Sequence, residues 1–163
     1  MTFDTYARSR LPALLRTATA ITGDSFLGED LVQEVLVKLH AHWPRLGEVE
    51  HLDAYVRRML VNQYVSWRRK WSRLVPTAVI PEQAVLDHAD RIADRDLLDR
   101  GLADLPPRQR IAMALRYLDG LSDADIAAAM ACSESSVRSF ISRGLVRLRI
   151  HLDAPATTPG GVR

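Results

Sequence analysis

Two helix-start signals lie eleven residues apart, at Ser122 and Ser133, and they restrict the fold more than any other feature of the chain. Ser122 is followed three residues later by Asp125, a hydroxyl and a carboxylate at the spacing that caps free backbone N–H groups at a helix start. Ser133 is followed by Glu134, an acid suited to the positive end of a helix dipole. We therefore expect one short helix from Asp123 and a second from Glu134, joined by a tight turn.

The second of these helices has two faces of opposite character. Its apolar positions recur every three or four residues, as on a buried face; they are Val137, Ile141, Leu145 and Leu148, with Phe140 beside them. The opposite face carries hydroxyl groups and arginines, at Ser135, Ser136, Arg138, Ser139, Ser142 and Arg143. This pattern is typical of a helix-turn-helix whose second helix enters the DNA major groove. The alternative is a plain helical hairpin, but a solvated face normally mixes both charge signs, and no acid follows Glu134 until Asp153.

The rest of the chain predicts further helices and no strand, so the expected fold class is all-α, with two small helical domains. The expected helices cover 3–10, 12–22, 25–41, 52–73, 91–103 and 107–118, and Trp43-Pro44 is expected to end the third of them. Pro76 and Pro81 lie in a segment without helical periodicity. We expect a first domain over 1–74, an acidic linker over 75–90, a second domain over 91–152 and a disordered tail over 153–163.

The helix expected over 52–73 ends in the sequence WRRKWSR. Positive charge at a helix C-terminus is stabilised by the dipole, which supplies a purely structural explanation. Cations interleaved with Trp67 and Trp71 are also what is expected where phosphates are neutralised and bases are stacked. The two indoles lie four residues apart on one face, so they could equally close a hydrophobic core.

Composition excludes several classes of protein. The formal net charge of the 163 residues is only +2, so a uniformly basic nucleic-acid coat is excluded. Residues 74–105 hold three arginines and seven acids, a net charge of 3 − 7 = −4, so the flanks are the basic parts. Cys132 is the only cysteine, which excludes an internal disulfide and indicates a small core residue or, alternatively, a redox switch. No metal-ligand spacing, signal peptide or membrane span is present in the sequence, and we expect a cytoplasmic protein without metal or cofactor.

Three stretches resemble a known family. They are GEDLVQEVLVKLHAHW (28–43), LDAYVRRMLVNQYVSWRRKW (52–71) and LADLPPRQRIAMALRYLDGLSDADIAAAMACSESSVRSFISRGLVRLR (102–149). In this order they are similar to regions 2.2, 2.3 to 2.4 and 4 of the extracytoplasmic-function sigma factors, group 4 of the sigma-70 family, with the sigma-E-like actinobacterial branch the most similar. The resemblance implies a transcription initiation subunit that binds core RNA polymerase and recognises the minus-10 and minus-35 elements of promoter DNA. Many members are held inactive by an anti-sigma factor, but no residue here identifies one.

The resemblance also implies roles for residues. The minus-35 element would be read by the hydroxyl and arginine face at Ser135, Ser136, Arg138, Ser139, Ser142 and Arg143. The minus-10 element would face the loop over 44–51 and the residues Arg57, Arg58, Asn62, Trp67, Arg68, Arg69 and Lys70. Core polymerase would dock on Asp30, Leu31, Gln33 and Glu34. For Arg57 and Arg58, salt bridges to neighbouring acids are the competing interpretation. The acidic linker is either a soluble tether or a segment that enters the polymerase channel or repels DNA.

The chain departs from the family at the turn between the two helices, where Ala131 stands in place of the usual glycine. Either Ala131 adopts a left-handed conformation or the turn differs. Phe140 and Gly144 also depart from the common arginine and alanine, which changes the expected minus-35 sequence. Two other functions are possible for a helix-turn-helix chain, a stand-alone repressor and an enzyme with a DNA-binding tail. A stand-alone repressor would need a dimerisation or effector domain, and an enzyme such as a serine recombinase would need more than Ser9, which has no positioned base; we therefore expect no enzyme.

Overall fold

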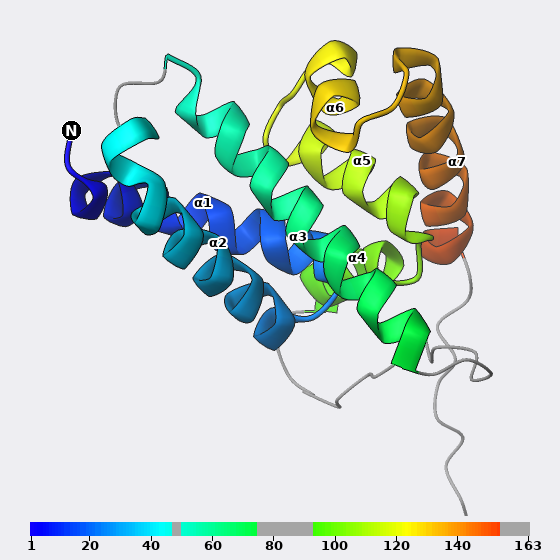
Figure 1. The fold of residues 1–163 in the computed structure, drawn as a ribbon. Helices are drawn as coiled ribbons and strands as arrows, with labels where there is room; N and C mark the ends of the chain where they lie inside the picture. Colours follow the sequence, from blue (N-terminus) through cyan, green and yellow to red (C-terminus); the bar gives the residue numbers. More distant parts are fainter. Residues whose placement is uncertain (47–49, 75–92, 154–163) are drawn as a thin grey trace, which may run out of the picture.

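The computed structural model describes residues 1–46, 50–74 and 93–153, and every regular element in them is an α-helix. The first lobe contains α1 (Phe3–Thr22), α2 (Ser25–Leu46) and α3 (Leu52–Leu74). The second contains α4 (Ala93–Ala103), α5 (Pro107–Tyr117), α6 (Asp123–Met130) and α7 (Glu134–Asp153). The all-α prediction is confirmed, and Figure 1 shows the two lobes side by side. The predicted linker over 75–90 and nearly all of the predicted tail lie outside the described residues.

Neither Pro12, predicted to begin a helix, nor Pro44, predicted to end one, marks a helix boundary in the structure. Pro12 lies inside α1, so a single helix replaces the two expected over 3–22, and Pro44 lies in the last turn of α2, which runs to Leu46. Proline removes one backbone hydrogen bond and bends a helix rather than always ending it. The buried face of α1 continues across the proline from Tyr6 to Leu14, so packing against the core keeps the two segments in one helix.

The first lobe is held together by close contact between α1 and α2. Gly28 of α2 lies against Thr19 of α1, where an added Cβ atom would come within 2.7 Å of the Thr19 hydroxyl oxygen. The lack of a side chain at Gly28 therefore lets the two helices approach. The fully buried Leu31, Val35 and Leu60 fill the space between the helices.

The helix-turn-helix forms as the sequence predicts. The Ser122 hydroxyl oxygen accepts the Asp125 N–H at 3.2 Å, and the Ser133 hydroxyl oxygen accepts the Ser136 N–H at 3.1 Å. Ala131 adopts the left-handed conformation, with φ 52° and ψ 49°, and ends α6. Cys132 follows it, half-buried and packed against the core.

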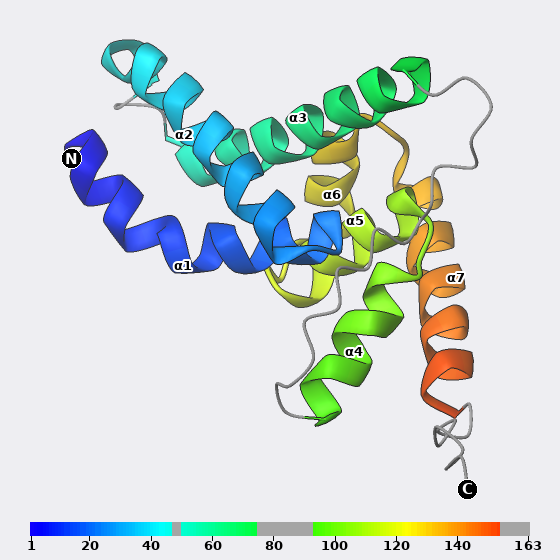
Figure 2. The ribbon, with the colours of Figure 1, turned by 90° about the horizontal axis from the view of Figure 1, so that it is seen from below.

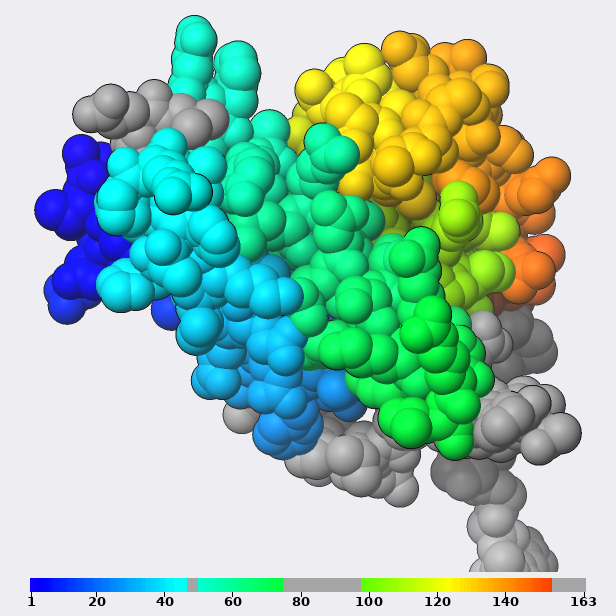
Figure 3. Space-filling model, in the orientation of Figure 1, coloured from blue at the N-terminus to red at the C-terminus, as the bar shows by residue number. Residues whose placement is uncertain are grey.

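Helix α5 joins the two lobes. Every residue from Gln109 to Leu115 is buried, because α5 packs against α1 on one side and α7 on another. A helix that is enclosed on all faces belongs to the interior. Helix α6 lies against α3, as Figure 2 shows from below. In Figure 3 the surface is continuous from α2 through α3 to α6. The two lobes therefore form one packed body.

Candidate nucleic-acid interface

The N-terminal half of α7 presents the hydroxyl and arginine face to solvent. Ser135, Arg138, Ser142 and Arg143 are exposed, while Ser136 and Ser139 are half-buried. Val137 and Ile141 are buried on the opposite side, so the apolar face fixes which side chains point outward. Ser133 caps the N-terminus of α7, where its hydroxyl oxygen accepts the Ser136 N–H and lies within hydrogen-bond distance of the Ser135 and Ser136 hydroxyls. Ser133 and Ser135 are exposed, so a phosphate or a base edge can reach this helix start.

Arg138 is held by two weak ion pairs. Its guanidinium lies 3.6 Å from an Asp123 carboxylate oxygen and 3.8 Å from a Glu134 carboxylate oxygen, and the side chain is 59 % exposed. Asp123 also pairs with Arg116 of α5 at close range. Exposed ion pairs contribute little to stability, so the acids orient the Arg138 side chain without preventing its use by a ligand.

The C-terminal half of α3 carries the basic, tryptophan-containing surface. Arg69 and Lys70 are exposed, and the Arg68 guanidinium carbon lies 6.0 Å from the centre of the Tyr64 ring. The Trp67 and Trp71 rings are 5.8 Å apart and tilted by 38°. Trp67 also packs against the core, so one of the two indoles contributes to core packing, which was the alternative to stacking on bases.

Trp67 is fixed further by a hydrogen bond to α2. Its indole N–H donates to a carboxylate oxygen of Glu34 at 3.0 Å, and the Gln63 amide donates to the same oxygen. Lys38 donates in turn to Gln63. A residue predicted to face DNA and a residue predicted to face polymerase therefore share one network.

Of the four residues predicted to dock on polymerase, three are exposed on α2 and one is not. Asp30, Gln33 and Glu34 are exposed, whereas Leu31 is fully buried in the core of the first lobe. The placement of Leu31 on a docking surface is therefore corrected, because it belongs to the apolar row that it forms with Val35 and Leu39.

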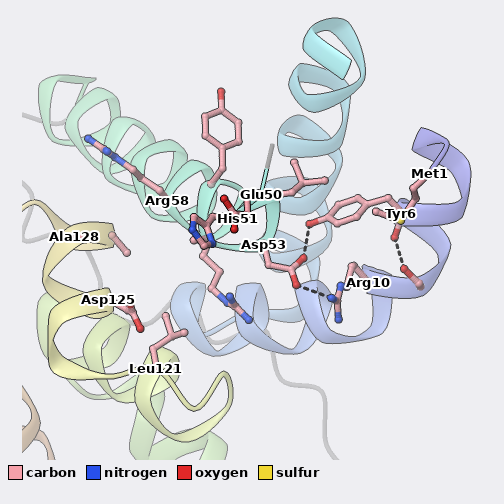
Figure 4. A pocket seen from close by; sticks show the side chains of 16 residues that line it. Met1, Tyr6, Arg10, Glu50, His51, Asp53, Arg58, Leu121, Asp125 and Ala128 are labelled. Carbon is pink, nitrogen blue, oxygen red and sulfur yellow. Dashed lines mark hydrogen bonds and ion pairs between the residues drawn. The ribbon is translucent and has the colours of Figure 1, made fainter. Parts of the chain in front are cut away.

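The N-terminal half of α3 borders a groove of about 800 Å³ between the lobes. Arg57, Arg58 and Asn62, the residues predicted to face the minus-10 element, lie along α3, and the first two line this groove with His51 and Tyr55. Helix α6 supplies the facing side through Ala128, Ala129 and Asp125. Figure 4 shows Arg58 and His51 on the α3 side and Asp125 and Ala128 across from them.

At the α1 end of the groove, a carboxylate network connects α1 to the start of α3. Asp53 accepts the Tyr6 hydroxyl at 3.0 Å and pairs with Arg10 at 2.6 Å (Figure 4). Burial, and secondarily the Asp53 carboxylate, raise the pKa of Tyr6 far above its ordinary value. Trp43 packs against Tyr6 from α2, with ring centres 5.6 Å apart. This network fixes the segment that leads into α3.

The sequence did not reveal two charged residues that connect the lobes. Arg110 is 6 % exposed and donates to the backbone carbonyls of Ile21, Ala103 and Leu105 and to the Tyr64 hydroxyl. Asp119 accepts from Thr17 and Arg57 across the interface. The buried position of Arg110 could not be predicted, because the residues around it have an ordinary amphipathic helix pattern. Asp119 precedes Gly120, and this pair predicts only a turn.

Comparisons with known proteins agree with this arrangement. Residues 6–74 match the family described as sigma-70 region 2, and residues 95–148 match the family described as sigma-70, region 4. The RNA polymerase sigma-E factor of Streptomyces avermitilis is 36% identical over 153 residues, which cover 93% of this chain and 86% of that protein. The ECF RNA polymerase sigma factor SigL of Mycobacterium tuberculosis is 29% identical over 151 residues, covering 89% and 85%. The sigma factor RpoE of Bartonella quintana, solved in complex with the anti-sigma factor NepR, has a TM-score of 0.79 at 29% identity and is covered to 97% by 93% of this chain.

A helical protein with a capped helix-turn-helix and a second basic helix belongs to the class of DNA-binding transcription proteins. The chain is, more specifically, a member of the sigma-70 family and an RNA polymerase sigma factor of the extracytoplasmic-function group. Recognition of minus-10 and minus-35 elements is typical of this family, whose members are not catalytic enzymes. Among the residues that the structure describes, no helix is long and apolar enough to cross a membrane, and no group of three potential metal ligands occurs.

Proposed function

We propose that the first three turns of α7 read the minus-35 element. The observation that carries this proposal is the exposed face of Ser135, Arg138, Ser142 and Arg143 behind an open, capped helix N-terminus. Arginine can form two hydrogen bonds with guanine, and small hydroxyl residues allow the helix to come close to base edges.

The minus-10 element is assigned to α3 and to the segment that precedes it. Arg57 and Arg58 supply cations at the N-terminal half, Asn62 an exposed amide, and Arg68, Arg69 and Lys70 phosphate contacts at the C-terminal half. Trp67, whose indole is already oriented by Glu34, supplies an aromatic surface for an unstacked base. The proposed domain that recognises the minus-10 element covers residues 1–74, and the proposed domain that recognises the minus-35 element covers residues 91–152.

The partners follow from the same assignment. Core RNA polymerase docks on α2 through Asp30, Gln33 and Glu34, which are exposed polar groups of that helix. Because the structurally similar RpoE was solved with the anti-sigma factor NepR, an anti-sigma factor is a proposed partner of this chain as well. The protein is then a non-catalytic subunit that acts in the cytoplasm, where polymerase and DNA are.

Transcription with purified components tests the proposal. The protein is mixed with core polymerase from a bacterium with a GC-rich genome and a pool of promoter fragments, and new transcript starts are mapped by sequencing. We expect starts that share two spaced motifs. Arg138→Ala should lose starts at promoters with the preferred minus-35 motif, while Arg149→Ala, on an exposed position further along α7, should retain them. Tight duplex binding without polymerase, and no new starts with it, would instead indicate a stand-alone repressor.

A further inference from the structure

The Asp119 carboxylate binds both a guanidinium and a hydroxyl group of the other lobe. One oxygen accepts the Thr17 hydroxyl at 2.8 Å, and the other lies 3.2 Å from Nε of Arg57. The Asp119 side chain is only 8% exposed, and Arg57 is 26% exposed. Asp119 follows Leu118, the C-cap of α5, and precedes Gly120 at φ +65°, so it lies near the negative end of the α5 dipole. A buried carboxylate is unfavourable there, and its compensation comes from the other lobe.

This arrangement is the one that a DNA phosphate would use. Arginine guanidinium groups and hydroxyl donors are common phosphate ligands, and a carboxylate offers the same pair of anionic oxygens. Arg57 belongs to the proposed minus-10 surface, and the groove beside it is bordered by α6 with a second acid, Asp125. DNA that binds Arg57 must therefore replace the Asp119 carboxylate of the second lobe.

Promoter geometry adds a second argument. The minus-10 and minus-35 elements are roughly 25 base pairs apart, or roughly 85 Å along a duplex at 3.4 Å per base pair. In this structure α3 is in direct contact with α6, the first helix of the helix-turn-helix. The two proposed reading surfaces cannot lie on both elements until the lobes separate.

We propose that Asp119 is an intramolecular competitor of promoter DNA, which holds the free chain closed by taking the Arg57 guanidinium in place of a phosphate. This inference rests on the proposed function, because it takes Arg57 as a DNA contact. In the closed form the α7 face stays exposed while Arg57 is occupied, so the minus-10 surface is the one that closure controls. Separation of the lobes releases Arg57 and the Thr17 hydroxyl together.

The test measures binding of the free full-length chain to a single-stranded oligonucleotide that carries the minus-10 motif found by start mapping. The variant is Asp119→Asn, which keeps the shape and removes the charge. The matched control is Asp125→Asn, the same change in an exposed acid of the groove that Arg57 lines. Fluorescence anisotropy at 0.1 M salt should show about tenfold tighter binding for Asp119→Asn. Asp125→Asn should stay within about threefold, because its charge is exposed and screened by salt and its carboxylate accepts the Ser122 hydroxyl of its own helix cap rather than a residue of α3.

Two further variants keep the result interpretable. Thr17→Val removes the other partner of Asp119 and keeps Arg57, and it should also tighten binding; it serves as the second test should Asp119→Asn fold poorly. Arg57→Ala combined with Asp119→Asn should abolish the gain. Small-angle X-ray scattering should show a larger radius of gyration for Asp119→Asn than for the unchanged chain.

The outcomes separate the two ideas. If the unchanged chain starts transcription with core polymerase but Asp119→Asn neither tightens binding nor expands the chain, the competitor role is wrong and the sigma assignment stands. Equal gains for Asp119→Asn and Asp125→Asn would also overturn it, because they would reflect general charge alone. If the unchanged chain starts no transcription with core polymerase, the proposed function itself fails, and the competitor role that rests on it fails with it.

Discussion

Replacing Arg110 by methionine should uncouple the two lobes. The guanidinium donates at 2.7 Å to the Ile21 carbonyl of α1 and at 2.6 Å to the Tyr64 hydroxyl of α3. It also binds the Ala103 and Leu105 carbonyls of its own lobe, at 2.9 and 3.3 Å. Methionine has a similar length but no donor, so these acceptors lose their partner in a buried site.

The magnitude follows from those four bonds. A hydrogen bond to a charged group contributes about 1.5–3 kcal/mol, and such contributions do not add when the groups share one donor. We expect a loss of about 3–5 kcal/mol in the free energy of unfolding. For a chain of this size each kcal/mol lowers Tm by roughly 2–4 °C, so the midpoint should fall by roughly 6–20 °C.

The chain provides a probe for each part of this effect. Its three tryptophans, Trp43, Trp67 and Trp71, are all in α2 and α3, so their fluorescence reports on the first lobe alone. Circular dichroism at 222 nm reports on the helices of both lobes. In the unchanged protein the two transitions should coincide, and in Arg110→Met they should separate.

Arg108→Met is the matched control for this prediction. Arg108 is exposed in the first turn of the same helix, where its guanidinium carbon lies 6.0 Å from the Phe140 ring centre. An exposed cation-π contact contributes about 0.5–1 kcal/mol, so the control should move Tm only slightly. An Arg110→Met protein with coincident transitions and a midpoint within about 2 °C of the unchanged protein would refute the argument.

Three other predictions follow from single positions. Arg138→Ala should weaken binding to a cognate minus-35 duplex by about 1–3 kcal/mol and hardly change Tm; an equal loss on scrambled duplexes would make Arg138 a phosphate contact instead. Ala131→Gly should raise the free energy of unfolding by up to about 1 kcal/mol, because glycine adopts φ 52° without strain, whereas Ala124→Gly inside α6 should lower it by about 1 kcal/mol in the same urea titration. The pKa of Tyr6 is raised in the folded state above its ordinary 10.0, so its contribution is complete below pH 10 and is lost as pH rises further; Tyr6→Phe should show a shallower loss of stability between pH 10 and 12.

Local signals in the sequence predicted the helix-turn-helix closely. The caps at Ser122 and Ser133 are each decided by a few neighbouring residues, so the sequence contains enough information to place them, whereas it left two alternatives for the turn at Ala131. The helix boundaries predicted at the two prolines were wrong, because burial of a continuous apolar face stabilises the helix more than the loss of one hydrogen bond destabilises it. That balance depends on packing partners far along the chain.

Contacts between the lobes were beyond sequence reasoning for the same reason. Asp119 and Thr17 are 102 positions apart, and Arg110 and Ile21 are 89 apart, so no periodicity links them. The proposed alternative for Arg57, a salt bridge to a neighbouring acid, was right in kind and wrong in partner, since its acid is Asp119 of the other lobe. Which surface residues become buried depends on how the lobes dock, and only the structure supplies that.

The network around Glu34 changes how substitutions on α2 are to be interpreted. Glu34 is exposed on the proposed polymerase-docking surface, but its carboxylate also accepts from the Trp67 indole and from Gln63 on α3. Removing it would free an indole on the proposed minus-10 surface, so a loss of transcription in a Glu34 variant would combine a docking effect with a DNA effect. Asp30 is exposed on the same helix. Polymerase affinity should therefore be assigned from Asp30, and the difference between the Asp30 and Glu34 variants then measures how far polymerase docking and minus-10 recognition are coupled through Trp67.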